Sequence, residues 1–204
     1  MFYLNFKSQD IDSQGIKLHL QLFSPEKLPQ NFKTQILDFY RCVWPWGFRG
    51  PDQFRDWITG TADKPKHLVL SKGDILVGAL TIVERSIEIG LCVKGYGFEL
   101  VTGVTGVIIY PNFQGQGLGK IMVQEGLKLC QEKSQITLFH CEESQKGFYE
   151  KCGMTSISNL QVFEGPTTEP SETKGVMMAL AKNQKLVSSL ASSSESLYFG
   201  LYTW

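Results

Sequence analysis

The chain has 204 residues, and its 20 lysines and arginines balance its 20 aspartates and glutamates. This length fits one large domain with a sizeable core, and the 42% hydrophobic content excludes a disordered chain. The lack of a basic excess disfavours nucleic acid and membrane partners. We therefore expect a single domain over residues 1–204, with a core at about 16–180 and a tail, 181–204, that packs back on it.

No targeting, membrane or metal motif is visible in the sequence. The first residues lack the basic region and long apolar run of a signal peptide. The longest apolar run, at 107–110, is far too short to span a bilayer. The 5 cysteines are scattered and form no Cys-x-x-Cys pair. We therefore expect a cytoplasmic protein with reduced thiols and no metal site.

Hydrophobic periodicity predicts strands and helices along the first half of the chain. The predicted strands comprise residues 16–22, 67–71, 75–83 and 96–110. A helix follows Pro29, and a short helix is expected at 52–58. The turn Lys72-Gly73-Asp74 favours a hairpin, whereas Gly103 and Gly106 suggest a bulge in the last of these strands.

The second half begins with a helix whose predicted buried face holds six residues. These are Leu118, Ile121, Met122, Gly126, Leu129 and Cys130. Further strands are predicted at 136–141, 161–163 and 176–180. A compact helix at 144–152 ends on Gly153 as its left-handed cap. The serine-rich stretch 188–196 reads as a linker before an aromatic end.

The most informative stretch joins a strand to a helix and reads Pro111-Asn112-Phe113-Gln114-Gly115-Gln116-Gly117-Leu118-Gly119-Lys120. Its glycines let successive N–H groups point into one concavity, and the helix N-terminus adds partial positive charge, so a pyrophosphate would fit. A Walker A loop would need Gly at Gln114 and Ser or Thr at Ile121, and the Rossmann spacing is also absent. The alternative is a tight turn without a ligand.

The segment Gln114-Gly115-Gln116-Gly117-Leu118-Gly119 resembles the coenzyme A pyrophosphate loop of the GCN5-related N-acetyltransferases (GNAT family). A second block, Phe148-Tyr149-Glu150-Lys151-Cys152-Gly153-Met154, is similar to that family's Phe-Tyr-x-x-x-Gly-Phe signature. The resemblance implies an α+β, GNAT-like fold, in which helices flank a central twisted, mostly antiparallel sheet with a splayed strand pair. It covers about residues 16–180, with its specific motifs between 105 and 154.

The resemblance also implies acetyl-CoA as the cofactor. Pantetheine would pair with the backbone of the strand before the loop, and the Ile109 N–H or a neighbouring one would polarise the thioester carbonyl. The implied cofactor-binding residues are Val107, Ile108, Ile109, Gln114, Gly115, Gln116, Gly117, Leu118, Gly119, Lys120 and Tyr149.

By the same resemblance Tyr149 is the general acid that protonates the leaving thiolate, and the alternative is a core tyrosine beside Phe148. Many relatives carry a glutamate base where this chain has Thr105. The candidate acceptors for a water relay are Glu99, Glu142 and His140. Each could equally be an ordinary solvated residue, and an amine delivered uncharged would need no strong base.

The acceptor side is expected to draw on an early aromatic loop and on scattered acids. The candidate substrate-binding residues are Trp46, Phe48, Glu99, Glu142 and Trp204. The terminal Trp204 also makes the chain similar to the aminoglycoside 2′-N-acetyltransferase branch, from which Thr105 and Gln114 depart. Simple aromatic packing is the alternative for Trp204.

Together these features predict an acetyl-CoA-dependent N-acetyltransferase that acts on a primary amine of a small molecule. The protein is expected to be a monomer or homodimer. Two alternatives stay open: a non-catalytic acyl-CoA-binding domain, which Thr105 favours and Tyr149 disfavours, and a protein N-acetyltransferase.

Overall fold

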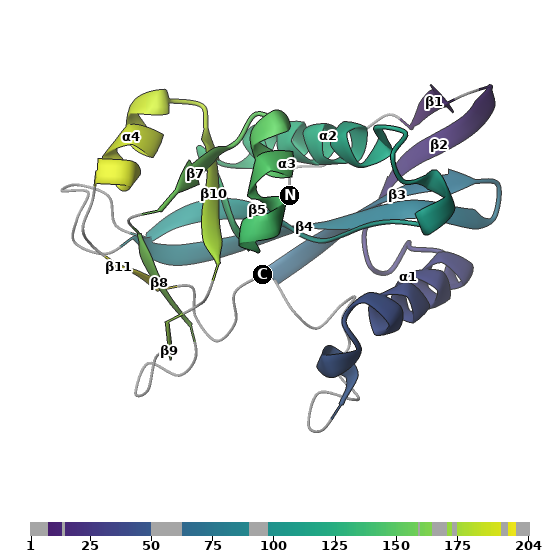
Figure 1. The fold of residues 1–204 in the computed structure, drawn as a ribbon, viewed down its shortest axis with the longest axis horizontal. Coiled ribbons are helices and arrows are strands. Elements are labelled where there is room, and N and C mark those ends of the chain that lie inside the picture. Colours follow the sequence, from purple (N-terminus) through teal and green to yellow (C-terminus); the bar gives the residue numbers. More distant parts are fainter. Residues whose placement is uncertain are drawn as a thin grey trace. The chain divides into compact units, whose positions relative to one another are not determined.

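The computed structural model describes residues 8–13, 15–49, 63–89, 98–158, 160–164, 171–172, 175–192 and 196–198. Its helices are α1 (Gln30–Val43), α2 (Leu118–Lys133), α3 (Lys146–Lys151) and α4 (Gln184–Ser192). Its strands are β1 (Gln9–Ser13), β2 (Ile16–Phe23), β3 (Asp63–Lys72), β4 (Ile75–Ile89), β5 (Phe98–Ile109), β6 (Ile136–Cys141), β7 (Thr155–Ile157), β8 (Gln161–Glu164), β9 (Ser171–Glu172), β10 (Val176–Ala181) and β11 (Ser196–Tyr198). The expected mixed α+β class, with a mostly antiparallel sheet, is confirmed (Figure 1).

The chain divides into two compact units, each described by itself. The first unit comprises residues 1–83 and 105–126, and the second comprises 84–104 and 127–204. Strands β4 and β5 and helix α2 contribute to both units. No helix in the described ranges is both long and apolar enough to span a bilayer.

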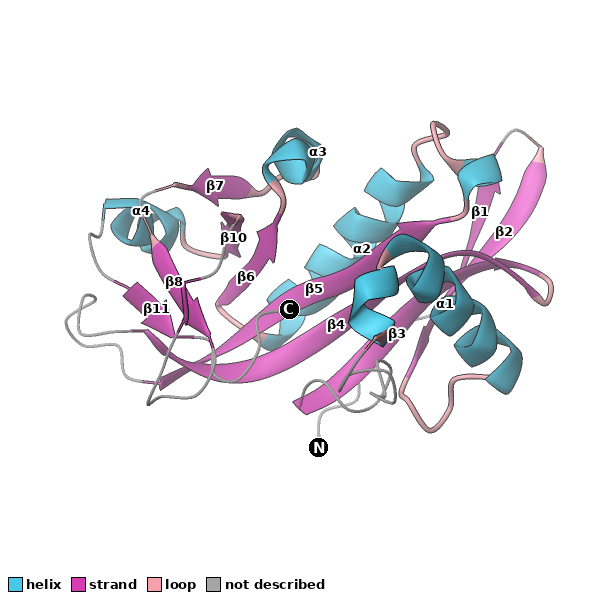
Figure 2. Ribbon diagram, turned by 60° about the horizontal axis from the view of Figure 1, so that its bottom comes forward, coloured by secondary structure: helices cyan, strands magenta, loops and turns pink. Residues whose placement is uncertain are grey.

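The first unit is a sheet in the order β1-β2-β3-β4-β5, and it has a helix on each face. Helix α1 lies on one face and the N-terminal half of α2 on the other (Figure 2). The register between β2 and β3 pairs Leu20 with Leu70, both fully buried, as the alternation of residues 16–22 predicts. On the α2 face, a Cβ at Gly126 would contact the Leu80 side chain at 3.2 Å.

Helix α1 follows Pro29 and buries one face. Phe32, Ile36 and Tyr40 are at most 5% exposed and pack with Val69 of β3 and others in one cluster. Their spacing of four residues places them on successive turns of one face. The predicted helix after Pro29 is therefore confirmed.

The hairpin between β3 and β4 turns at Gly73, whose φ of +58° suits a residue without a Cβ. Strand β4 continues to Ile89. In β5 the backbone takes a φ of +60° at Gly106 in the middle of the strand, which agrees with the bulge predicted there.

The second unit is built around β6, β10 and β7. Strand β10 runs antiparallel to both β6 and β7, whereas β5 pairs with β6 in parallel through only Val101↔Ile136 and Thr102↔Thr137. Strand β11 pairs with β4 and β8, and its Leu197 is fully buried. The short β5–β6 pairing fits the splayed strand pair that the family resemblance implies.

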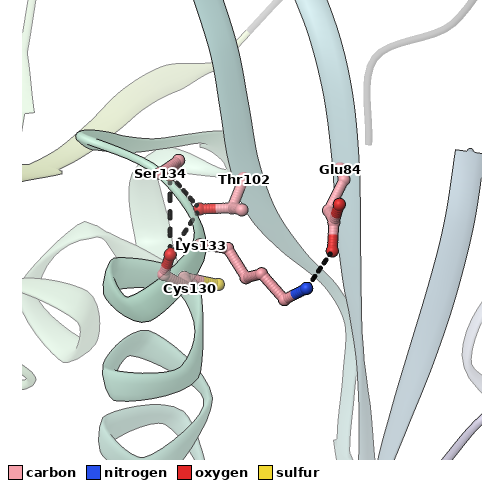
Figure 3. A network of polar contacts seen from close by, with 5 residues as sticks. All are labelled: Glu84, Thr102, Cys130, Lys133 and Ser134. Atoms are coloured by element: carbon pink, nitrogen blue, oxygen red, sulfur yellow. Dashed lines mark hydrogen bonds and ion pairs between the residues drawn. The ribbon is translucent and has the colours of Figure 1, made fainter. Parts of the chain in front are cut away.

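A buried polar cluster lies where β5 and β6 are paired (Figure 3). The Thr102 hydroxyl is within 2.8 Å of Ser134 Oγ and 3.1 Å of Thr137 Oγ1, and it donates to the Cys130 carbonyl at 3.4 Å. All of these groups are buried. Because each hydroxyl has a partner, the cluster links the two strands to the end of α2 without an unsatisfied polar group.

Three sequence expectations for the second half need correction. Helix α4 covers Gln184–Ser192, so most of the serine-rich stretch is helical rather than a linker, with Val187 and Leu190 buried one turn apart. The helix expected at 144–152 is shorter, because a 3₁₀ turn at Glu143–Gln145 precedes α3. On α2, Ile121 was expected on the buried face but is 37% exposed, whereas Val123 is buried.

Candidate functional site

The loop between β5 and α2 presents a row of backbone N–H groups. Gly115 and Gly117 take φ values of +75° and +79°, which turn the chain, and helix α2 then begins at Leu118. Within the part of the chain that the structure describes, no N–H from Gly115 to Lys120 has a hydrogen-bond partner. Such a row at a helix N-terminus is an anion-binding arrangement.

The two glutamines of this loop hold it in place with their side chains. Gln114 Nε2 donates to the Ile109 carbonyl at 2.8 Å, and Gln116 Nε2 donates to the Asn112 carbonyl at 3.2 Å. Gln116 Oε1 also accepts from the Ser13 hydroxyl of β1 at 3.2 Å. An anion in this loop would therefore meet chiefly backbone N–H groups and the exposed side chain of Lys120.

The loop has open space where an anion would need it. A Cβ added to Gly115 or to Gly117 would meet no atom within 4 Å. The same holds for the turn glycine Gly73, so the requirement for glycine at both positions comes from the positive φ and not from a close neighbour.

At its C-terminal end, β5 is paired with β4 along one edge. The Tyr110 N–H donates to the Val77 carbonyl at 2.9 Å, so the Ile109 N–H, one residue earlier, points to the opposite edge. At Gly78 of β4, a Cβ would come within 2.8 Å of the Ile108 carbonyl. Gly78 thus permits a close approach of the two backbones, a role that no sequence motif indicated.

The other first-unit candidates lie on β5 and in the turn after α1. Thr105 is half-buried on β5. Phe48, in the 3₁₀ turn Pro45–Phe48, is half-buried with the Arg41 guanidinium 5.4 Å from its ring centre. The side chain of Trp46 and the helix expected at 52–58 lie outside the described residues.

Tyr149, the expected general acid, lies on α3 in the second unit. Its ring packs edge-on against Phe139 of β6 at 4.9 Å and Phe148 at 5.0 Å. Burial raises the pKa of Tyr149 well above its ordinary value, so the phenol keeps its proton. Among the described residues its hydroxyl has no hydrogen-bond partner.

The candidate acceptors of the second unit have different surroundings. His140 is half-buried on β6 and stands opposite Met177 of β10. Glu142 directly follows β6, is exposed, and accepts a long 3.4 Å hydrogen bond from Ser144. The side chain of Glu99 and all of Trp204 lie outside the described residues.

The predicted site residues thus fall into two groups. The strand and loop residues from Thr105 to Lys120, with Phe48, belong to the first unit, whereas His140, Glu142 and Tyr149 belong to the second. Sequence reasoning missed Gly78 and Tyr40, which contact β5. The sequence signs of a special backbone in β5 were Gly103 and Gly106, of which Gly106 has a positive φ.

The chain is similar in sequence to known proteins. The sequence model of the acetyltransferase (GNAT) family matches residues 30–154. Glucosamine 6-phosphate N-acetyltransferase of Schizosaccharomyces pombe is 40% identical over 50 residues, which are 24% of this chain and 45% of that protein. The chain thus spans about half the length of this curated relative.

Solved structures share the fold at low sequence identity. Escherichia coli ElaA has a TM-score of 0.56 at 16% identity, over 79% of this chain and 98% of that one. Arabidopsis thaliana NAA60 in complex with acetyl-CoA has a TM-score of 0.57 at 11% identity, over 80% and 99% of the two chains. Because the family model spans more than half of the sequence, including the loop and α3, the chain belongs to the GNAT family of acetyltransferases.

Proposed function

We propose that the protein transfers an acetyl group from acetyl-CoA to a primary amine of a small molecule. The observation that carries the proposal is the row of N–H groups from Gly115 to Lys120, which have no hydrogen-bond partner among the described residues and lie at the N-terminus of α2, in a chain of the GNAT family. A backbone-made anion site needs no excess of lysine or arginine, which agrees with the zero net charge.

The residues of the first unit fit the two ends of an acyl-coenzyme A. The loop N–H groups would hold the pyrophosphate, with Lys120 exposed beside them. The edge of β5 that faces away from β4 would offer the N–H groups of Val107 and Ile109 and the C=O group of Val107 to pantetheine, while the Ile109 carbonyl accepts from Gln114. When bound, acetyl-CoA supplies an activated thioester, and an N–H at Ile109 would stabilise negative charge on the carbonyl oxygen.

Tyr149 is proposed as the proton donor. A general acid must hold its proton at neutral pH and have a hydroxyl that is not already committed to another acceptor. The raised pKa of Tyr149 meets the first condition. The hydroxyl, which has no partner among the described residues, meets the second.

The proposals for the general base and for the amine that accepts the acetyl group draw on less specific features. His140 and Glu142 are both at the end of β6, and Thr105 cannot accept a proton at neutral pH, so we propose a water relay to one of these two residues. The similarity to a glucosamine 6-phosphate N-acetyltransferase over 50 residues supports a small amine as acceptor. The aminoglycoside branch, the cytoplasmic location and the monomer or homodimer stay predictions, as do the acceptor roles of Trp46, Glu99 and Trp204.

A second candidate function is a domain that binds acyl-CoA without turnover, and Thr105 favours it because many relatives carry a glutamate base at this place. A panel of amines distinguishes this candidate from the proposed enzyme. Acetyl-CoA is offered with amino sugars, polyamines, amino acids and peptides with free N-termini, and the acetylated product is measured by mass spectrometry. We expect turnover of at least one small amine.

The variant Tyr149→Phe is the matched comparison, because it removes only the hydroxyl and keeps the ring contacts. We expect kcat to fall by about 10²-fold or more while the affinity for coenzyme A is kept. Coenzyme A binding without turnover of any amine would support the non-catalytic alternative. Turnover of peptides alone would support protein acetylation.

A further inference from the structure

A buried chain of polar side chains connects α1, β4 and β3 to the bulge of β5. Tyr40, on α1, is 5% exposed, and its hydroxyl donates to the Gly106 carbonyl at 3.2 Å. Its ring also packs edge-on against Trp44 at 5.2 Å. A helix side chain thus satisfies a strand carbonyl at the residue whose positive φ departs from regular strand geometry, which is the predicted bulge.

Gly106 is fitted to this tyrosine in two independent ways. Its φ of +60° is a conformation that residues with a Cβ rarely adopt. In addition, a Cβ at this position would overlap the Tyr40 hydroxyl and lie 2.7 Å from Cζ of the same ring. The glycine therefore serves both the backbone turn and the close approach of the ring.

The chain of polar groups continues behind Tyr40. The Thr81 side chain lowers the pKa of Tyr40 against the effect of burial, as a hydrogen-bond donor beside the phenol would, and His67 Nδ1 lies 2.9 Å from Thr81 Oγ1. His67 and Thr81 are 1% and 5% exposed. Because a carbonyl can only accept, Tyr40 donates to Gly106; Thr81 could then act on the phenol only as a donor, and His67 Nδ1 would in that case carry the proton that joins it to Thr81.

This direction of donation is compatible with the state of the phenol. Burial raises the pKa of Tyr40 to about 12, so the hydroxyl keeps its proton across the neutral range. A donor to the phenol oxygen would polarise the hydroxyl and strengthen its bond to the strand carbonyl. A phenylalanine would fill the same space but leave the Gly106 carbonyl without this donor.

The bulge directly precedes the residues that would bind pantetheine. Val107 follows Gly106, and Ile109 is the residue whose N–H points away from β4. Since a bulge re-aims the residues next to it, its geometry decides where the N–H and C=O groups of these residues point.

We propose that Tyr40 is a positioning residue for the acyl-coenzyme A site, which it serves by fixing the bulge at Gly106 through its hydroxyl, supported by Thr81 and His67. The inference rests on the proposed function for its ligand. It requires no contact between Tyr40 and the cofactor. Packing in the core cluster around α1 would by itself require only the ring of Tyr40 and not its hydroxyl.

The test uses Tyr40→Phe in the full chain, with Ile36→Val as the matched control. Ile36 is 1% exposed on the same face of α1, one turn earlier, so its loss of a methyl group lowers stability without touching the bulge. Coenzyme A affinity is measured by calorimetry. We expect Tyr40→Phe to weaken binding by about tenfold, the effect of one lost buried hydrogen bond, and Ile36→Val to leave it unchanged.

Amide hydrogen exchange at residues 106–109, without coenzyme A, gives a readout independent of the ligand. We expect faster exchange there in Tyr40→Phe than in Ile36→Val. Thr81→Val should weaken binding in the same direction, and the double variant should be less affected than the sum of the two, because both act through one chain of bonds.

Equal affinity and equal exchange in Tyr40→Phe and the wild type would overturn the inference. Failure of the wild type to bind coenzyme A would instead contradict the proposed function. In that case faster exchange at 106–109 would still support control of the bulge by Tyr40, and unchanged exchange would refute it.

Discussion

Individual cysteines of this chain differ in environment, and these differences predict their reactivity. Cys42 is exposed, Cys141 is half-buried and Cys130 is fully buried. Burial raises the pKa of Cys130 to about 12, and burial with nearby glutamates raises the pKa of Cys141 to about 11. Only the thiolate reacts with alkylating agents, so a raised pKa and burial both protect a thiol.

We therefore expect iodoacetamide at pH 8 to modify Cys42 in the folded protein and to leave Cys130 intact. Peptide mass spectrometry after a short exposure measures both sites. Addition of a denaturant should make Cys130 reactive, which serves as the control. Modification of Cys130 in the folded protein as fast as Cys42 would contradict its placement in the core.

Residue identity predicted the candidate site only in part. The loop from Gln114 to Lys120 could be recognised because its glycine spacing is specific to a backbone conformation. Tyr40 could not, because a tyrosine in a helical apolar stripe looks like any core aromatic. Its contact with Gly106 joins residues that are 66 positions apart, which no local pattern reports.

At the scale of elements, the polar cluster around Thr102 supports the short β5–β6 pairing. Its hydroxyl contacts Ser134, Thr137 and the Cys130 carbonyl, all buried. Thr102→Val keeps the shape of the side chain but leaves these groups with one partner fewer. We expect the free energy of unfolding to fall by about 1–3 kcal/mol.

Urea denaturation followed by circular dichroism measures this change. Thr155→Val is the control, since Thr155 is an exposed strand residue of the same unit. We expect the control to change stability by less than about 0.5 kcal/mol. If the two variants were equally stable, the cluster would not be a significant support of these strands.

Strands and helices with a clear hydrophobic pattern were predictable from sequence, as β2, the β3–β4 hairpin and α1 show, and so were the short strands β6, β8 and β10. Other short elements were not. Strand β7 has 3 residues, too few for a period, and α4 was hidden because its serines carry loop-like composition while Val187 and Leu190 supply its buried face. Tertiary contacts decide the structure of such segments more than local propensity does.

At the scale of the whole molecule, the balance of 20 basic and 20 acidic residues does not argue against an anionic ligand. An anion site built from N–H groups requires no net positive charge, so neutrality is compatible with an anionic cofactor. Acidic residues expected on the acceptor side, such as Glu142, would suit a cationic amine. The net charge of the molecule therefore does not restrict the charge of its small ligands.

The central claim is that the loop between β5 and α2 binds coenzyme A, and calorimetry with Gly117→Glu tests it most directly. Gly73→Glu is the matched control, because both glycines have positive φ values, +79° and +58°, and both have no atom within 4 Å of an added Cβ. A glutamate at Gly117 would place negative charge and bulk among the N–H groups.

We predict that the wild type and Gly73→Glu bind coenzyme A with similar affinity, and that Gly117→Glu, although folded by circular dichroism, shows no binding. Unchanged affinity in Gly117→Glu, or equal loss in both variants, would contradict the assignment of this loop.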